Sequence, residues 1–241
     1  MIRFSLIIPA FNEEACLPRL LDTVDAARAA YAGGVDAIEV IVADNASTDR
    51  TAALAAARGC RVARVEKRVI GAVRNGGARC ARGEILCFVD ADMRIHPQTF
   101  NEIDRALARP RVAAGATGAL PDRWSPGIAV TVGLLLPLAV LLRVDTGVVF
   151  CRRSDWEATG GYPEDCLFAE DLGFLFALRR RVVARGQHLT RATRARAVAS
   201  TRKFDKYGDW HYFRLPWAAI WSLVRDPVHQ RWARRYWYED R

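Results

Sequence analysis

Residues 84–92 read EILCFVDAD, a run of five apolar residues that begins after a glutamate and ends in two aspartates. An uninterrupted apolar run of strand length predicts a strand buried on both faces, as in a parallel sheet covered by helices. Apolar runs also occur at residues 4–9 and 38–43, and residues 61–65 are expected to form a shorter strand. Helical patterns fill the intervals between them, at residues 14–31, 51–58, 73–82 and 97–107. The alternation predicts an α/β fold with a Rossmann-like, mostly parallel sheet and helices on both faces.

The composition sets the class of protein. The chain has 241 residues, of which 51% are hydrophobic and 26% are charged. Such a chain buries a full core, which excludes a disordered, collagen-like or small disulfide-bonded protein. The six cysteines show neither CxxC nor zinc-site spacing and the N-terminus lacks a signal-peptide pattern, so a reducing, cytoplasmic setting is expected. The net charge of +9 favours an anionic partner: a nucleotide, a phospholipid surface or nucleic acid.

Acidic residues stand where such a sheet binds its ligands, beyond the carboxyl ends of the strands. Asp90 and Asp92 directly follow an apolar run, and on a continuing strand their side chains point the same way. Two carboxylates in that position suit Mg²⁺ or Mn²⁺, which would also hold a diphosphate. Asp44 ends the run at residues 38–43, where its carboxylate can accept a hydrogen bond from a base or a ribose hydroxyl.

Other polar residues have two interpretations. Ser47, Thr48 and Asp49 can simply cap the helix that follows them. Glu170 and Asp171 open the apolar periodic stretch LGFLFALRR, where the helix dipole favours acids in the first turn. The same pair suits a general base held near a reacting hydroxyl.

Taken in order, these motifs resemble those of the family 2 glycosyltransferases, nucleotide-sugar enzymes with a GT-A-type fold. The matching segments are SLIIPAFNEE (5–14), VIVADNASTDRT (40–51), RNGGARCARGEILCFVDADMRIHP (74–97), GVVFCRRSDWEATGGYPED (147–165) and the stretch at 169–186. The resemblance covers about residues 2–186. It implies an inverting, metal-dependent transfer of sugar from a nucleoside-diphosphate sugar, most often a UDP-sugar, to a hydroxyl of a lipid-linked, glycolipid or small-molecule acceptor.

The resemblance also implies roles for individual residues. The nucleotide pocket would contain Pro9, Phe11, Asn12, Glu13, Asp44, Arg74 and Asp90. Asp92 would be the main ligand of Mn²⁺ or Mg²⁺, with Asp90 beside it. Asp171, with Glu170 next to it, would be the catalytic base, and the segment at 160–162, Gly-Gly-Tyr, would shape the acceptor side.

After Gly186 the resemblance weakens. Arg202 and Lys203 lie in a basic, aromatic segment that could reach the diphosphate, although a solvated basic turn explains them as well. His188 or His211 could complete the metal site, although each fits an ordinary strand or surface histidine better.

We divide the chain into a catalytic domain at 1–204 and an aromatic, basic extension at 205–241. Five of the seven tryptophans lie between 210 and 237, interleaved with arginines. This pattern favours a helix at 208–241 on an anionic membrane surface over one that closes the core. Residues 126–143 carry 16 uncharged residues between their ends, fewer than the roughly 20 apolar residues of a membrane span. They predict a buried or groove-lining helix, with a re-entrant or surface-lying segment as the alternative.

The leading hypothesis is therefore a cytoplasmic transferase, peripheral on the cytoplasmic face of a membrane. The alternative is a non-catalytic protein that binds a nucleotide or nucleotide-sugar on the same fold. A nucleotidyltransferase would need a Gly-rich loop where residues 10–13 read AFNE. A nucleic-acid binder would leave the acidic clusters without a role, so nucleic acid is not the expected partner.

Overall fold

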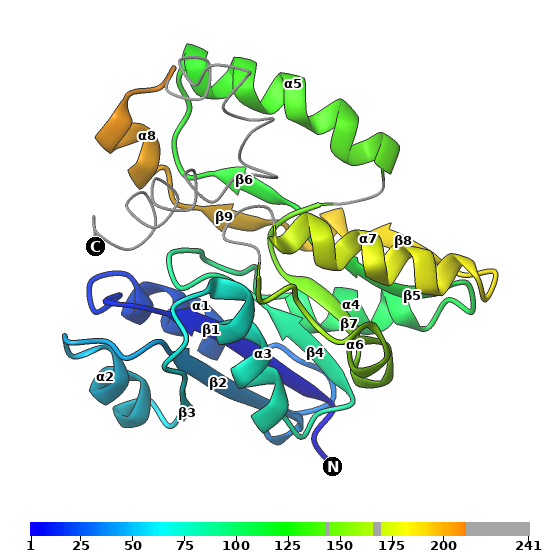
Figure 1. The fold of residues 1–241 in the computed structure, drawn as a ribbon, viewed down its shortest axis with the longest axis horizontal. Coiled ribbons are helices and arrows are strands. Elements are labelled where there is room, and N and C mark those ends of the chain that lie inside the picture. The colour runs from blue at the N-terminus through cyan, green and yellow to red at the C-terminus, as the bar shows by residue number, and fades with distance from the viewer. Residues whose placement is uncertain (143–144, 166–169, 211–241) are drawn as a thin grey trace.

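The computed structural model describes residues 1–142, 145–165 and 170–210 (Figure 1). Their main sheet has the strand order β3-β2-β1-β4-β7-β5-β8, and β6 pairs with β9 in a second, small sheet. The strands are β1 Phe4–Ala10, β2 Ile38–Asp44, β3 Arg61–Arg64, β4 Ile85–Phe88, β5 Val112–Ala116, β6 Ala119–Pro121, β7 Val149–Arg152, β8 His188–Arg191 and β9 Ala197–Ala199. Strands β3, β2, β1 and β4 run parallel, whereas β7 is antiparallel to both of its neighbours. The predicted α/β fold with a mostly parallel sheet is confirmed.

Helices cover both faces of this sheet (Figure 1). They are α1 Leu17–Ala29, α2 Thr51–Ala57, α3 Ile70–Cys80, α4 Thr99–Leu107, α5 Pro126–Leu142, α6 Arg153–Thr159, α7 Glu170–Val183 and α8 Arg202–Tyr207. Two short 3-10 turns lie at Val35–Ala37 and Thr193–Ala195.

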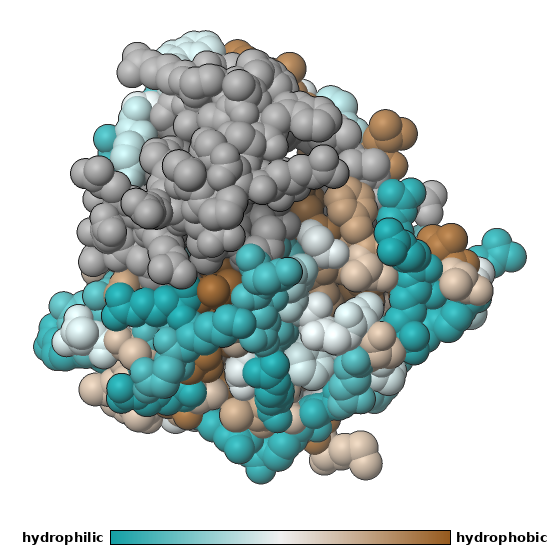
Figure 2. Space-filling model, in the orientation of Figure 1, coloured by the Kyte–Doolittle hydropathy of each residue, from teal (hydrophilic) through white to brown (hydrophobic). Residues whose placement is uncertain are grey.

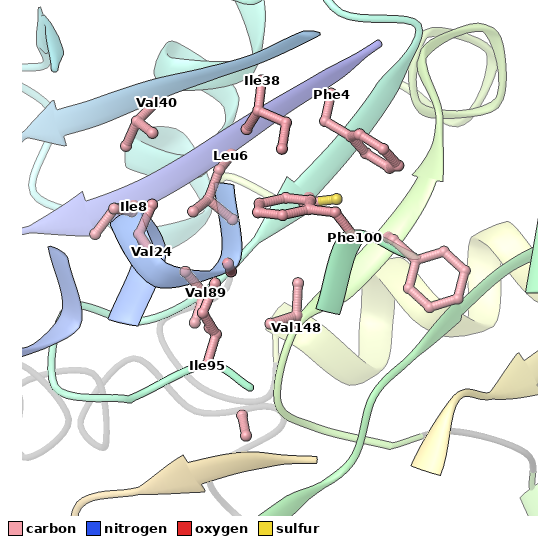
Figure 3. Packing of buried hydrophobic residues seen from close by; sticks show 14 of the residues in the cluster. Phe4, Leu6, Ile8, Val24, Ile38, Val40, Val89, Ile95, Phe100 and Val148 are labelled. Atoms are coloured by element: carbon pink, nitrogen blue, oxygen red, sulfur yellow. The ribbon is translucent and has the colours of Figure 1, made fainter. Parts of the chain in front are cut away.

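The alternation of side chains along β1 builds two hydrophobic cores. Phe4, Leu6 and Ile8 point to one face, where they pack with residues of α1 and α4 (Figure 3). Ile7 points to the other face, into a cluster with residues of α3 and α7. The rings of Phe4 and Phe100 lie 5.2 Å apart. Because both faces are buried, every residue of β1 is apolar or hydrogen-bonded internally, as the uninterrupted apolar run predicts.

Helix α5 departs from the expectation for residues 126–143. Ile128 and Thr131 are buried, but Leu134 is 62% exposed and Leu141 is 76% exposed. The interpretation as a buried helix is therefore wrong, whereas a groove-lining, re-entrant or surface-lying segment stays a prediction. Within the described ranges, no helix combines the length and the apolar character that crossing a bilayer requires.

The C-terminal extension is described only at its start. Helix α8 runs across position 204, so the division between 1–204 and 205–241 stays a prediction. Most of the segment at 208–241, including His211, lies outside the described residues. The membrane-surface interpretation of that segment also stays a prediction.

Candidate functional site

The carboxyl ends of β1, β2 and β4 meet at one edge of the sheet, where two loops are bonded to each other. The backbone N–H of Asn12 donates to the Ser47 hydroxyl at 3.1 Å, and the Asn12 side-chain oxygen accepts from the N–H of Thr48 at 2.9 Å. The N–H of Glu13 donates to the Thr51 hydroxyl at 2.8 Å. These bonds hold Asn12 in a left-handed conformation, with φ of 50°. The loop after β1 is therefore fixed before any ligand binds.

These contacts correct the helix-capping interpretation of Ser47 and Thr48. The residue at the N-cap of α2 is Arg50, whose own side chain makes no capping hydrogen bond. Asp49 accepts from the N–H of Thr51 at 2.9 Å, and Glu14 accepts from the N–H of Arg50 at 3.0 Å. Ser47 and Thr48 instead bond Asn12, a partner far away in the sequence.

Asp44 and Phe11 are both buried at this edge. The Asp44 carboxylate accepts from the N–H of Ser47 at 3.3 Å and 3.4 Å, which holds its turn closed. The guanidinium of Arg68 lies 4.9 Å from the centre of the Phe11 ring. Sequence analysis did not single out Arg68, whose signal is its place in a basic segment just before α3. Pro9, the penultimate residue of β1, aligns with Ala43 of β2 and so lies beside these residues.

Arg74 of α3 is the centre of the site. Its side chain is almost completely buried, and its guanidinium contacts three carboxylates. Nη2 lies 2.7 Å from Asp90 Oδ1, while Nη1 lies 2.7 Å from both Glu170 Oε1 and Asp171 Oδ1. Tyr162 lies under the guanidinium, 5.1 Å from its ring centre. One cation thus joins the segment after β4 to the start of α7.

The surroundings of Asp171 change its acidity. Neighbouring groups enclose the carboxyl although 41% of its side-chain surface is open to solvent. This enclosure, reinforced by repulsion from Glu170 and Asp90 and opposed by Arg74, raises the pKa of Asp171 to about 7. A carboxylate with that pKa is half-protonated at neutral pH, which suits a group that accepts a proton.

A second arginine, Arg202 at the start of α8, completes the edge. Nη2 and Nη1 of Arg202 contact the two Glu13 carboxylate oxygens at 2.7 Å and 2.9 Å, and Nε lies 3.0 Å from Asp92 Oδ2. Thr201 directly precedes Arg202, and its hydroxyl donates to the Asp122 carboxylate at 2.6 Å. This bond fixes the start of α8. The interpretation of Arg202 as part of a solvated turn is therefore wrong. Lys203, its half-buried neighbour, also has partners.

Asp90 and Asp92 lie in a turn rather than on a strand. Strand β4 ends at Phe88, and the N–H of Met93 donates to the carbonyl of Asp90 at 3.1 Å. The expectation that the two side chains point the same way, as on a continuing strand, is therefore wrong. The two carboxylates diverge instead, Asp90 toward Arg74 and Asp92 toward Arg202.

His188, the histidine candidate that the structure describes, does not join these carboxylates. His188 begins β8, which runs in the same direction as β4, so it lies at the sheet edge opposite the segment after β4. Its interpretation as an ordinary strand residue is confirmed. Among the residues that the structure describes, no group of three or more His, Cys, Asp or Glu side chains is arranged to hold a metal.

The segment at 160–162 docks on α3 through Asn75. Asn75 accepts from the N–H of Tyr162 at 2.9 Å and donates to its carbonyl at 2.9 Å. A Cβ at Gly161 would come within 2.4 Å of the Asn75 oxygen, so only glycine fits there. The Tyr162 ring stacks on Phe174 of α7 at 4.2 Å. Asn75 is a positioning residue that sequence analysis missed; its only signal is that it follows Arg74.

Comparisons with known proteins identify the family and the fold. Residues 5–124 match the family described as glycosyl transferase family 2. A relative from Pseudomonas paraeruginosa (strain DSM 24068 / PA7), undecaprenyl-phosphate 4-deoxy-4-formamido-L-arabinose transferase, is 35% identical over 125 residues. That match covers 49% of this chain and 35% of the relative. The chain thus aligns with about a third of that protein's length.

Two crystal structures share the fold. S. aureus TarS 1–349 in complex with UDP superposes with a TM-score of 0.63 at 20% identity, over 86% of this chain and 63% of that one. Glucosyl-3-phosphoglycerate synthase from Mycobacterium tuberculosis, in complex with Mn²⁺, UDP and phosphoglyceric acid, gives 0.61 at 20% identity, over 94% and 80%. The fold is that of GT-A transferases, and with its sequence match the chain belongs to glycosyl transferase family 2.

Proposed function

We propose that this protein is an inverting, metal-dependent glycosyltransferase that moves a sugar from a nucleoside-diphosphate sugar to an acceptor hydroxyl. The observation that carries the proposal is the shared contact of Arg74 with Asp90 and Asp171, each at 2.7 Å. One buried guanidinium thus joins Asp90, which would lie beside the donor, to Asp171, which would accept the proton. The UDP in the TarS structure makes a UDP-sugar the first donor to test.

The fixed loops at the ends of β1 and β2 would bind the nucleotide. Phe11 offers a buried ring, and Asp44 offers a carboxylate that can accept from the base or the ribose. Arg202, and Lys203 beside it, bring positive charge to the edge where a diphosphate would lie. Pro9 at the end of β1, and Asn12 and Glu13 in the loop after it, would line the same pocket.

The carboxylates of Asp90 and Asp92 are hard oxygen donors and fit Mn²⁺ or Mg²⁺. A divalent ion held by them would neutralise the charge that develops on the leaving diphosphate. Oxygen atoms of the diphosphate would supply further ligands. The Mn²⁺ and UDP in the M. tuberculosis structure support this assignment.

Asp171 would act as the catalytic base. Arg74 holds its carboxylate in place, and its pKa of about 7 matches the working pH of a base. It would take the acceptor proton as the hydroxyl attacks the anomeric carbon opposite the leaving group, which inverts the configuration. Glu170 would hold Arg74 and keep the charge balance at the base.

The acceptor would be a hydroxyl of a lipid-linked compound, a glycolipid or a small metabolite. The undecaprenyl-phosphate in the name of the Pseudomonas relative supports a lipid-linked one. We place the reaction in the cytoplasm, at the cytoplasmic face of a membrane.

Thermal shift with UDP, GDP, dTDP and CDP, each with Mn²⁺, Mg²⁺ or EDTA, tests the donor site. A nucleotide at about 100 times its dissociation constant stabilises the fold by about 2.7 kcal/mol. One nucleotide should raise the melting temperature in a metal-dependent way, and Asp92→Asn should remove the dependence on metal. If no nucleotide raises it, the proposal is wrong.

Sugar release from the matching donor tests the base. We expect Asp171→Asn to keep the nucleotide shift and to lower turnover about 100-fold or more. The matched control is Asp165→Asn, an exposed residue, which should keep both. Nucleotide binding without turnover in the wild type would instead show a non-catalytic binding protein.

A further inference from the structure

Helix α5 presents a wide hydrophobic surface to solvent. Its exposed large side chains are Val130, Leu134, Leu136, Val140 and Leu141, which we call the α5 apolar face. Helix α5 contains no charged residue over its 17 residues. It lies at the edge of the molecule, beyond the small β6-β9 sheet (Figure 1), where Figure 2 shows hydrophobic residues at the upper edge. An exposed apolar surface of this kind marks an interaction site.

Aromatic and basic side chains surround the start of this helix. Trp124 is 57% exposed and Trp210 is 46% exposed, and Lys206 of α8, which is also exposed, lies in the chain just before Trp210. Arg123 holds the two segments together through ion pairs with Asp205 at 2.6 Å and Asp209 at 2.7 Å. A Cβ added at Gly127 would come within 2.6 Å of the carbonyl oxygen of Asp209. The backbone just after α8 therefore lies close against the start of α5.

This combination matches the chemistry of a lipid–water interface. Tryptophan is favoured at the depth of the headgroups, lysine pairs with anionic lipids, and an uncharged apolar face is favoured among the acyl chains. The net charge of +9 adds a general attraction to an anionic surface. A second protein would instead be expected to meet some polar groups, which the α5 apolar face does not offer.

We propose that the α5 apolar face docks on an anionic lipid bilayer, with Trp124, Trp210 and Lys206 at the headgroups. Helix α5 then lies along the membrane, partly immersed. This docking is independent of the sugar-transfer proposal, because it needs neither donor nor catalytic residues. It also differs from membrane binding by the segment at 208–241, from which it uses Trp210 alone.

Flotation of the full chain with vesicles tests the docking. One set contains phosphatidylcholine alone, and the other contains about one third phosphatidylglycerol. We expect the wild type to bind the mixed vesicles at least tenfold more strongly, and Leu134→Glu/Leu141→Glu to lose at least tenfold of that binding. The control Val35→Glu changes an exposed valine far from α5 in the chain and should bind like the wild type.

Four results would overturn the proposal. The first is equal binding of the double variant and the control, and the second is equal binding to both vesicle types. The third is self-association of the wild type in sedimentation velocity that the double variant abolishes, which would make a second copy the occupant. If the double variant instead exposes residues 211–241 to protease and vesicle binding is unchanged, that segment covers the face and the proposal fails. Leu134→Gln/Leu141→Gln repeats the test without added charge, should the glutamates unfold the chain.

Discussion

Arg74 shows how much of the site depends on a single side chain. It is buried, and a buried guanidinium is stable only when anions compensate its charge. Three carboxylates do so here, which leaves an excess of negative charge at the edge of the sheet. Burial and this excess raise the proton affinity of Asp171, although Glu170 is the less exposed of the two side chains. The carboxylates that compensate the charge of Arg74 therefore also help to set the pKa of Asp171.

The pH dependence of activity follows from Asp171. Because its pKa is raised to about 7, kcat/KM should fall about tenfold per pH unit below that value, as the base becomes protonated. Glu170→Gln removes a repelling charge and releases Arg74 to Asp171, so this acidic limb should move to lower pH. The pH profile of kcat/KM with the variant and with the exposed control Glu157→Gln checks this. A limb that stays at the wild-type pH in both would contradict the assignment.

The same group affects stability with a defined sign. Its folded pKa exceeds the ordinary value of 3.8, so the folded state binds more protons between pH 3.8 and about 7. The stabilisation is complete below that window and is lost as pH rises through about 7.

At the scale of elements, the contact of α3 with the loop before α7 positions the site. Gly71 lies in the first turn of α3, where a Cβ would come within 2.2 Å of the carbonyl oxygen of Pro163. We expect Gly71→Ala to lower the free energy of unfolding by about 1–3 kcal/mol, because the loop must move away. Urea denaturation measures it. The control is Gly133→Ala in α5, where nothing lies within 4 Å and a gain of up to about 1 kcal/mol is expected. Equal effects at both glycines would refute the argument.

Elements with local signals were predictable, and those set by distant partners were not. Strand β2 was expected at 38–43 and extends over Ile38–Asp44, because most residues of a strand buried on both faces are apolar. The antiparallel direction of β7 depends on which strands flank it, and its sequence VFCR carries no sign of that. Ser47 and Thr48 look like capping residues because the alternative partner, Asn12, is 35 or 36 residues away.

At the scale of the molecule, Arg202 joins the two ends of the described chain across 189 residues. Without it, the buried Glu13 and the nearby Asp92 would repel each other. We expect Arg202→Gln to cost about 2–4 kcal/mol of stability. Mn²⁺ should raise the melting temperature of this variant more than that of the wild type, since it replaces the lost positive charge. Arg50→Gln, which breaks an exposed pair with Glu14, is the control and should cost less than about 1 kcal/mol. If Mn²⁺ raises the melting temperature of the variant and the wild type equally, the ion does not replace the charge of Arg202.

The position of β7 in the sheet also has a consequence for folding during translation. Strand β7 lies between β4 and β5, although β5 comes before it in the chain. On the ribosome, both flanking strands exist before the strand that joins them has been translated. Until then, the apolar β4, ILCF, has an open edge with unpaired backbone groups, a surface that other nascent chains can add to. The two parts of the sheet merge only after residue 152 has been made, so the half-translated polypeptide is the form most exposed to aggregation.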